Sequence, residues 1–398
     1  MRSIILFDDP KLRLQLLPFT YTRPIAGIRC GILTIAEKWN AYLQTEISYQ
    51  TEAYLSDRFP LVKTEDPVYI NGALCPDALL AEAIEKMPSE SVLFSTAHEI
   101  LAVRTIASNW NPDDDLKYLT SIIYSESVVL IRQIWDIFSN NGTQIKADFE
   151  KITASRTSAE LTDPFTRCYN TDNIFIEEGA VIKAAILNAE NGPIYIGRNA
   201  TIQEGALVQG PFTIGEGSVL AQGAKIRPNT TVGPFCKVGG EVSNSVIFGY
   251  SNKGHDGYLG NSVLGEWCNL GANTNNSNLK NDHTPVKLHS YATGALESTG
   301  LLFCGLFMGD YSKAGISTMF NTGTVVGVNV NVFGAGFQPK HIPSYSWGGK
   351  AEGFTEYRFE KATAVANDTV SRRHINFDAT DEKILRKVFE QTQEHRQY

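Results

Sequence analysis

The sequence lacks the features of a membrane, secreted or nucleic-acid-binding protein. It has no stretch approaching 18 consecutive apolar residues, and the apolar run at residues 4–7 is too short for a signal peptide. The six cysteines are dispersed and form no C-x-x-C pair, so we expect reduced thiols and a cytoplasmic protein. An excess of basic residues is also missing. The net charge of −8 argues against a general binder of nucleic acid or anionic membranes.

Glycine is missing from the first 26 residues, but it recurs later at a fixed spacing. Over residues 196–238 every sixth position is aliphatic, at Ile196, Ile202, Val208, Ile214, Leu220, Ile226, Val232 and Val238. The residues two positions earlier are mostly small, and five of the seven residues three positions later are Gly or Asn.

Residues two apart on a strand face the same way, so each aliphatic residue and its small partner can point inward together. Gly or Asn can then adopt the left-handed conformation of a corner. The six-residue period therefore predicts a parallel β-helix of hexapeptide repeats. An ordinary β-sandwich would show spacings of 8–12 residues and strict alternation.

The period fails twice, at residues 249–258 and 273–303. Segments that leave a regular solenoid are where binding residues tend to lie. Both interruptions are therefore expected to contribute to a site.

The first 160 residues have a different pattern. Strands are predicted at residues 3–7, 68–70, 91–95 and 100–106, with helical spacing from residue 32 to 43 and a helix after Asp77, and residues 116–138 are expected to be largely helical. Alternating strands and helices predict an α/β sandwich, with residues 8–23 and 71–76 at the mouth beyond the strand ends.

These patterns give three predicted regions, because a chain of 398 residues exceeds a usual single domain. They are an α/β domain over residues 1–160, a β-helix over residues 161–336, and a tail over residues 337–398. The tail is expected to carry helices near residues 359–371 and 381–394.

Four ordered motifs carry a resemblance to a known family. They are Arg227-Pro228, then Glu241-Val242, then residues 253–258 with the His255-to-Tyr258 spacing, and then residues 268–272 followed by Asn278. The sequence resembles the bifunctional N-acetylglucosamine-1-phosphate uridylyltransferase/glucosamine-1-phosphate acetyltransferase family, and more closely its branch with a short N-terminal head. The resemblance implies a nucleotidyltransferase-like (Rossmann-like) head, a left-handed β-helix and a homotrimer with sites between neighbouring subunits.

The resemblance also implies roles for residues of the β-helix. His255 would be the general base that takes a proton from the sugar amine as it attacks acetyl-CoA. Further residues would bind the substrates: Arg227 the phosphate, Tyr258, Asn269 and Asn278 the sugar, and Ala272 the acetyl-CoA. Ser243 stands where the family has a phosphate-binding Lys, and Lys253 or Lys287 could replace it. Imidazole suits this task because its pKa lies near neutrality.

The head matches the family less well. Arg13-Leu14, residues 17–20 and Arg23-Pro24 resemble the second half of the nucleotidyltransferase pattern, but residues 8–12 replace its glycines. Asn71 stands where the family has a magnesium-binding Asp. Either Asp8 or Asp9 takes Mg²⁺, while Arg13, Arg23 and Lys38 hold the phosphates, or the head has lost transferase activity. We favour retained activity.

The main hypothesis is a bifunctional enzyme of UDP-N-acetylglucosamine biosynthesis, which supplies the cell envelope. It would use acetyl-CoA, glucosamine-1-phosphate and UTP. One alternative is a nucleotidyltransferase whose β-helix is only a trimerisation or regulatory scaffold, and another is a non-catalytic solenoid. His283 and His289 are one rung apart, but they lack the third ligand of a carbonic-anhydrase-like zinc site.

Overall fold

A computed structural model describes residues 2–106, 110–114 and 116–398. The chain divides into two compact units. The first comprises Met1–Ile28 and Leu33–Gln133, and the second comprises Arg29–Ile32 and Ile134–Tyr398. The domain boundaries proposed from the sequence at residues 160 and 336 remain predictions.

The first unit is built on a six-stranded mixed sheet. Its spatial order is β2 (Ile47–Gln50), β1 (Ser3–Phe7), β3 (Pro67–Asn71), β6 (Ile100–Arg104), β5 (Ser91–Phe94) and β7 (Thr120–Ile123). β1 runs parallel to both of its neighbours, β6 is antiparallel to β3 and β5, and β5 is parallel to β7. A second small ladder pairs β4 (Leu74–Cys75) with β8 (Val129–Leu130). The four strands expected from the sequence are confirmed.

Helices connect these strands. They are α1 (Pro10–Gln15), α2 (Ile35–Leu43) and α3 (Ala78–Glu85), with short 3-10 turns η1 (Ile25–Gly27) and η2 (Ala53–Leu55). Thr34 and Glu37 form a capping box at the start of α2, and the Asp77 carboxylate accepts from Leu80 N–H at 2.8 Å at the start of α3. The Asp77 cap explains why α3 begins where the sequence predicts, and the Thr34 cap starts α2 at Ile35, three residues after the predicted helical spacing begins.

The expected helix over residues 116–138 is wrong. This segment forms β7 and β8 before the short helix α4 (Asp136–Ser139). β7 pairs in parallel with β5, from Ser91↔Thr120 to Phe94↔Ile123. Its β-branched residues suit that exposed sheet edge, so pairing outweighed the helix-like spacing of apolar residues.

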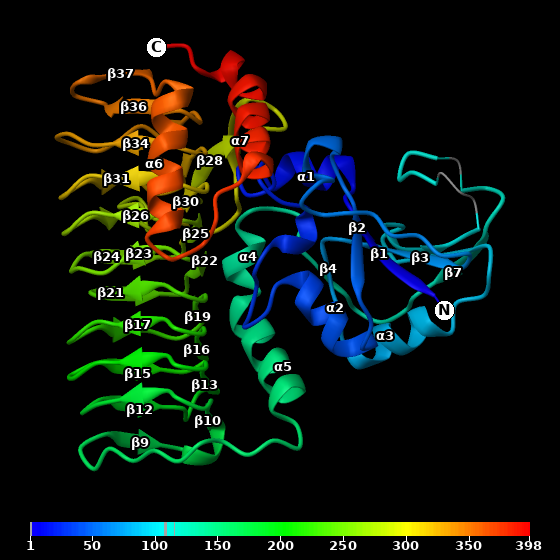
Figure 1. Cartoon of the computed structure of the whole chain (residues 1–398), viewed down its shortest axis with the longest axis horizontal. Helices are drawn as coiled ribbons and strands as arrows, with labels where there is room; N and C mark the ends of the chain where they lie inside the picture. Colours follow the sequence, from blue (N-terminus) through cyan, green and yellow to red (C-terminus); the bar gives the residue numbers. More distant parts are fainter. Residues whose placement is uncertain (1, 107–109, 115) are drawn as a thin grey trace. The chain divides into compact units, whose positions relative to one another are not determined.

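The second unit is a column of stacked turns (Figure 1) with three strands in most turns. Sheet I contains β10 (Ile174–Ile176), β13 (Ile194–Ile196), β16 (Phe212–Ile214), β19 (Thr230–Val232), β22 (Val246–Gly249), β25 (Val263–Glu266), β30 (Leu306–Met308), β33 (Thr324–Val326) and β35 (His341–Ile342). Sheet II contains β11 (Val181–Ile182), β14 (Thr201–Ile202), β17 (Val219–Leu220), β20 (Lys237–Val238), β23 (Asn252–Lys253), β26 (Asn269–Leu270), β31 (Lys313–Ala314), β34 (Asn331–Val332), β36 (Ser346–Gly349) and β37 (Gly353–Glu356).

Sheet III contains β9 (Arg167–Tyr169), β12 (Ile186–Asn188), β15 (Leu207–Gln209), β18 (Lys225–Ile226), β21 (Glu241–Ser243) and β24 (Tyr258–Gly260). The pair β27 (Asn275–Asn276) and β32 (Met319–Phe320) follows β24. Neighbouring strands pair in parallel throughout, apart from the final hairpin of β36 with β37.

The six-residue period explains this column. All eight aliphatic residues from Ile196 to Val238 are buried, with at most 2% of their surface exposed. The corner residues Asn199, Gly205, Gly217, Gly223 and Asn229 have φ between 54° and 76°. This arrangement confirms the predicted fold class, an α/β nucleotidyltransferase-like region followed by a parallel β-helix.

The two predicted interruptions differ. Residues 249–258 stay in the column and form β23 and β24. Residues 277–305, here called the arm, leave it and carry an antiparallel hairpin of β28 (Lys287–Ser290) and β29 (Ala295–Ser298). The column also continues past residue 336, through β35 and β36.

Helices lie against the column. α5 (Asn141–Thr153), which the sequence did not predict, contacts sheet I, where the Asn141 amide donates to Asn229 O at 2.9 Å. The two expected C-terminal helices are confirmed as α6 (Phe359–Ser371) and α7 (Ala379–Gln391). Short turns η3 (Thr171–Asn173) and η4 (Gln393–His395) complete the described elements. None of the helices in the described ranges has the length and apolar character needed to cross a bilayer.

Candidate active site

Polar side chains gather on the outer face of sheet III, here called the Tyr258 cluster: Arg227, Glu241, Tyr258, Asn261 and Asn278. Arg227 Nε donates to Glu241 Oε1 at 2.8 Å, and Glu241 is the register partner of Tyr258. The Asn278 amide donates to the Tyr258 hydroxyl at 2.9 Å and to Asn261 Oδ1 at 2.8 Å. One face therefore combines a guanidinium, a carboxylate, a phenol and two amides.

Local backbone geometry sets the position of Tyr258. A Cβ atom on Gly260 would collide with the Tyr258 hydroxyl, so the glycine lets the phenol lie along the sheet. The main-chain N–H of Tyr258 donates to Asn275 Oδ1 at 2.8 Å. Burial, together with the Glu241 carboxylate, raises the pKa of Tyr258, while the Asn278 hydrogen bond opposes this shift. The phenol therefore stays protonated and can act as a hydrogen-bond donor at neutral pH.

The ion pair within the cluster leaves Arg227 able to bind an anion. The Arg227 side chain is 60% exposed and that of Glu241 is 33% exposed. An exposed ion pair of this kind contributes about 0–1 kcal/mol to stability, so a phosphate can replace Glu241 on Arg227 at little cost in free energy. A guanidinium has five N–H donors, and the Nε–H bond to Glu241 engages one of them.

His255 lies in the corner between sheets II and III, here called the His255 corner (residues 254–257). Its side chain is exposed and makes no hydrogen bond or ion pair within the part of the chain described. Asn273 N–H donates to Asp256 O at 2.9 Å, which places Ala272 beside His255 in the next turn of the column. An open imidazole beside a small residue leaves room for a ligand.

Lys253 points into the column, unlike the substrate ligand expected from the sequence. It is 2% exposed, and its Nζ donates to Gly239 O at 2.9 Å and His255 O at 2.8 Å. Lys253 is the register partner of Val238, so it occupies an aliphatic position of the repeat. The alternative phosphate ligand, Lys287, is exposed on the arm hairpin.

Asn269 lies on sheet II, across the His255 corner from Tyr258. Its register partners are Asn252 and Lys313. A single chain therefore brings together Arg227, Tyr258 and Asn278, but it leaves Asn269 on another face. Sequence reasoning gave no role to Glu241, Asn261 or Asn275, since short polar residues of a solenoid carry no distinctive spacing.

In the first unit, Asp8 and Arg13 bind each other. Arg13 Nη1 donates to Asp8 Oδ2 at 2.7 Å, and Arg13 also donates to the main-chain carbonyl of Thr20. The other Asp8 contacts are the Thr51 hydroxyl at 2.5 Å and Ile25 N–H at 2.8 Å. Burial raises the pKa of Asp8, while Arg13 opposes the shift. The pair is internal, with both residues less than 9% exposed.

The other predicted head residues are also held by the protein. Asp9 Oδ1 caps α1 and accepts from Lys11 and Leu12 N–H. Asn71 donates to Ile100 O and accepts from Ala73 N–H. Arg23 and Lys38 are 5% and 1% exposed.

As held here, Asp8 and Asn71 do not fit Mg²⁺, because protein donors already engage both Asp8 oxygens and Asn71 Oδ1, while Asp9 uses Oδ1 for its cap. Among the described residues, no group of three His, Cys, Asp or Glu side chains is suited to a metal ion. Asp8 faces a buried guanidinium, and Asn71 closes its own turn.

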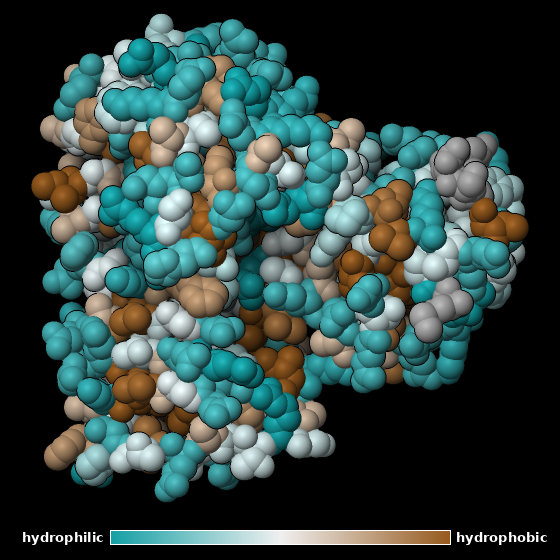
Figure 2. Space-filling model, viewed as in Figure 1, coloured by the Kyte–Doolittle hydropathy of each residue, from teal (hydrophilic) through white to brown (hydrophobic). Residues whose placement is uncertain are grey.

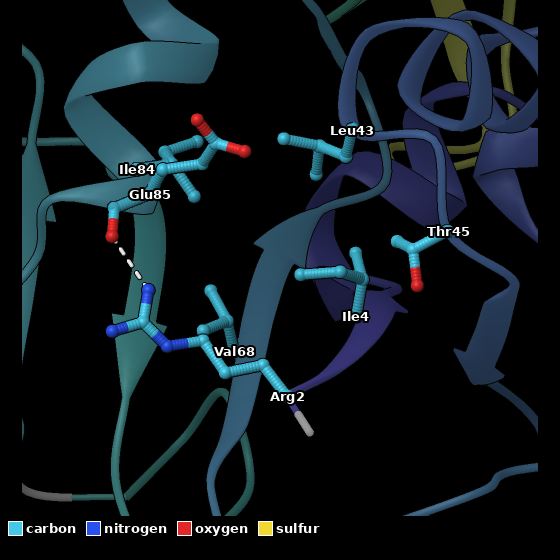
Figure 3. A pocket seen from close by; sticks show the side chains of 7 residues that line it. All are labelled: Arg2, Ile4, Leu43, Thr45, Val68, Ile84 and Glu85. Carbon is cyan, nitrogen blue, oxygen red and sulfur yellow. Dashed lines mark hydrogen bonds between the residues drawn. The ribbon is translucent and has the colours of Figure 1, made fainter.

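A cavity of about 210 Å³ lies near the start of β1 and β3, away from the ends that carry Asp8 and Asn71. Its walls include Ile4, Val68 and Ile84, and Arg2 donates to Glu85 O at 2.5 Å across one side (Figure 3). These mostly apolar walls do not match a nucleoside triphosphate.

Comparison with known proteins assigns the family. The sugar nucleotidyl transferase family matches residues 4–157. The uncharacterized acetyltransferase YaiX of Escherichia coli is 34% identical over 161 residues, which are 40% of this chain and 69% of that protein. The bifunctional sugar-1-phosphate nucleotidylyltransferase/acetyltransferase of Sulfurisphaera tokodaii is 35% identical over 144 residues, 36% of this chain and 35% of that protein. The chain belongs to this nucleotidyltransferase/acetyltransferase family.

Coverage of the family's bifunctional members is partial. The bifunctional protein GlmU of Methanocaldococcus jannaschii is 40% identical over 89 residues, 22% of this chain and 21% of that protein. The chain thus matches about a fifth to a third of the length of these two bifunctional relatives. Membership of the family fits both the α/β unit and the solenoid.

Proposed function

We propose that the solenoid transfers an acetyl group from acetyl-CoA to the amine of an amino-sugar phosphate such as glucosamine-1-phosphate. The observation that carries the proposal is the Tyr258 cluster, which presents Arg227, Tyr258 and Asn278 together beside the His255 corner. A scaffold would not need this combination of groups on an outer face. Ala272, next to His255, is the proposed contact for acetyl-CoA.

In the proposed reaction the amine nitrogen attacks the thioester carbonyl of acetyl-CoA. A C–N bond forms, the C–S bond breaks, and His255 takes the proton that the amine loses. The thiolate of CoA leaves and is protonated. Tyr258 and Asn278 orient the sugar through hydrogen bonds, and Arg227 binds the phosphate.

For the head we propose nucleotidyl transfer to a sugar-1-phosphate, with UTP as donor and UDP-N-acetylglucosamine as product. This proposal is supported by the family match over residues 4–157. It assigns no residue to Mg²⁺, since Asp8 and Asn71 are engaged by the protein and Asp9 caps α1. Pyrophosphate release from UTP and N-acetylglucosamine-1-phosphate, measured with and without Mg²⁺, tests it. If no common nucleoside triphosphate gives pyrophosphate release, the proposal of nucleotidyl transfer by the head fails.

The acetyl-transfer proposal is tested by His255→Ala. Thiol release from acetyl-CoA with a panel of amino-sugar phosphates should fall roughly 10²–10⁴-fold, because the amine loses its general base. His283→Ala is the matched control, since His283 is an exposed histidine of the arm. Unchanged thiol release in His255→Ala would show that another group is the base. No release by the native protein would favour a scaffold role for the solenoid.

We further propose a homotrimer in the cytoplasm, with acetyl-transfer sites completed between subunits. Asn269 supports this proposal, because it lies on a different face from the Tyr258 cluster. A neighbouring subunit could bring a sheet II face toward sheet III. All six cysteines are free thiols, as expected in a reducing compartment.

A further inference from the structure

The buried lysine of the solenoid is the least expected residue of its core. Lys253 lies between Val238 and Leu270 in the inward column of sheet II. The other inward residues of that column are apolar: Ile182, Ile202, Leu220, Val238, Leu270, Ala314 and Val332. Burying an ammonium group is costly unless hydrogen bonds compensate for the lost water. The ammonium group of Lys253 must therefore be compensated by hydrogen bonds inside the column.

The ammonium group joins two turns of the column. Nζ donates to Gly239 O in one turn and to His255 O in the next. Gly240 makes room for it, because a Cβ there would lie 2.8 Å from Nζ, and its φ of +69° already favours glycine. Burial lowers the pKa of Lys253 to about 8, and the nearby Asp256 carboxylate partly opposes the shift. At neutral pH the group is therefore mostly charged, and its hydrogen bonds are strong.

The carbonyl that Lys253 holds belongs to the proposed general base. His255 itself has an exposed side chain with no hydrogen bond among the described residues, so its main chain must supply the order of the corner. The neighbouring bonds of the corner come from Glu241 N–H to Gly257 O and from Asn273 N–H to Asp256 O. Lys253 supplies the corresponding bond at His255.

We propose that Lys253 is a positioning residue, which fixes the main chain of His255 from inside the column and so sets the direction of its imidazole. This inference rests on the proposed acetyl transfer. Lys253 itself does not reach the reacting atoms, since its ammonium points inward. A base displaced by about 1 Å can lose roughly 10²-fold in rate.

The test compares Lys253→Met with Leu220→Met. Methionine is apolar and of similar length, so it suits the column, and Leu220 is a fully buried residue of the same column with no link to the corner. Lys253→Met should lower kcat for acetyl transfer at least roughly tenfold, with KM for both substrates changed less than about twofold. The native rate of acetyl transfer should fall as the pH rises through about 8, because Lys253 then loses its charge. The pH profile of Lys253→Met should lack this fall. Leu220→Met should keep native values in both respects.

Amide hydrogen exchange gives a readout that does not depend on the reaction. Protection of the Glu241, Tyr258 and Asn273 amides, which are hydrogen-bonded at the corner, should fall in Lys253→Met and persist in Leu220→Met. If the native protein releases no thiol, the acetyl-transfer proposal fails, while exchange still measures whether Lys253 orders the corner. Lys253→Gln, which keeps an uncharged N–H donor, replaces the methionine variant if that variant does not fold and should be intermediate. Native kcat, pH profile and exchange in the variant would overturn the proposal.

Discussion

At the scale of single residues, the Tyr258 hydroxyl offers a sharp test of the cluster. Its partner Asn278 also donates to Asn261, so removing the hydroxyl leaves Asn278 with one acceptor. Tyr258→Phe should raise KM for the amino-sugar phosphate roughly tenfold, because it removes one hydrogen bond to the substrate, worth about 1.4 kcal/mol. The melting temperature should be almost unchanged.

Tyr250→Phe is the control for that variant. Tyr250 stacks between Phe235 and Trp267 at a different corner, at 5.3 and 4.3 Å between ring centroids. It should leave KM unaltered. An equal change of KM in both variants would show that the effect comes from the column rather than from contact with substrate.

At the scale of elements, the arm is attached to the column through a group of aromatic and imidazole rings. The His289 and His341 rings stack at 3.7 Å, and the Tyr291 hydroxyl lies 3.3 Å from His341 Nε2. Lys340 Nζ donates to Lys287 O at 2.7 Å beside them. His395 of η4 faces the same rings, 5.6 Å from Tyr291, and Glu394 lies 4.0 Å from His395.

This attachment should weaken in acid. Burial, reinforced by His289 and His395, lowers the pKa of His341 to about 3. An unfolded histidine titrates near 6.5, so between about pH 6.5 and 3 the unfolded chain binds more protons than the folded chain. Stability is therefore fully present above about pH 6.5 and falls as the pH drops, by about 2 kcal/mol at pH 5 for this one group.

The measurement is the free energy of unfolding from pH 7.5 to 4.5 for the native chain and for His341→Gln. Glutamine keeps an acceptor for the Tyr291 hydroxyl but does not titrate in this range. The variant should lose less stability than the native chain on acidification. Parallel pH curves would show that other groups, such as Asp and Glu side chains, determine the acid sensitivity.

The same scale shows what the sequence could predict and what it could not. The period of six was decisive because an inward aliphatic residue and a left-handed corner recur at fixed positions, and Ile196 and Asn199 occupy them. The helix predicted over residues 116–138 is wrong, since their apolar spacing does not show that β5 offers them a parallel partner.

The site was predictable only where motif and geometry coincide. Arg227, Tyr258 and Asn278 meet on one face, as the motif order suggests. The sequence predicts a substrate contact for Lys253, but its pairing with Val238 makes it face inward, and the six-residue period cannot show this because it is interrupted there. The sequence predicts different ligands for Asp8 and Arg13, although a carboxylate after β1 and a guanidinium on the next helix, α1, neutralise each other when buried.

At the scale of the whole molecule, the outer face of sheet III carries exposed apolar residues. Hydrophobic residues are visible among polar ones on the face of the molecule in Figure 2. Ile186 and Leu207 are neighbours on sheet III with 40% and 44% exposure. Met319, 36% exposed, lies in β32, beyond the Tyr258 cluster on the same side of the column. Apolar residues on both sides of a polar site are what a subunit interface with a shared site requires.

Leu207→Glu should therefore separate the proposed trimer, because it places a charge in the apolar part of that face. Light scattering should give a molecular mass of about three times 43.9 kDa for the native protein and about 43.9 kDa for the variant. Acetyl transfer should be lost with the trimer, since Asn269 and the Tyr258 cluster would then have no partner face, while pyrophosphate release by the head should persist. Leu79→Glu, at a 61% exposed residue of α3, is the control and should stay trimeric. A native monomer that transfers acetyl groups would instead require a complete site within one chain, with no contribution from Asn269.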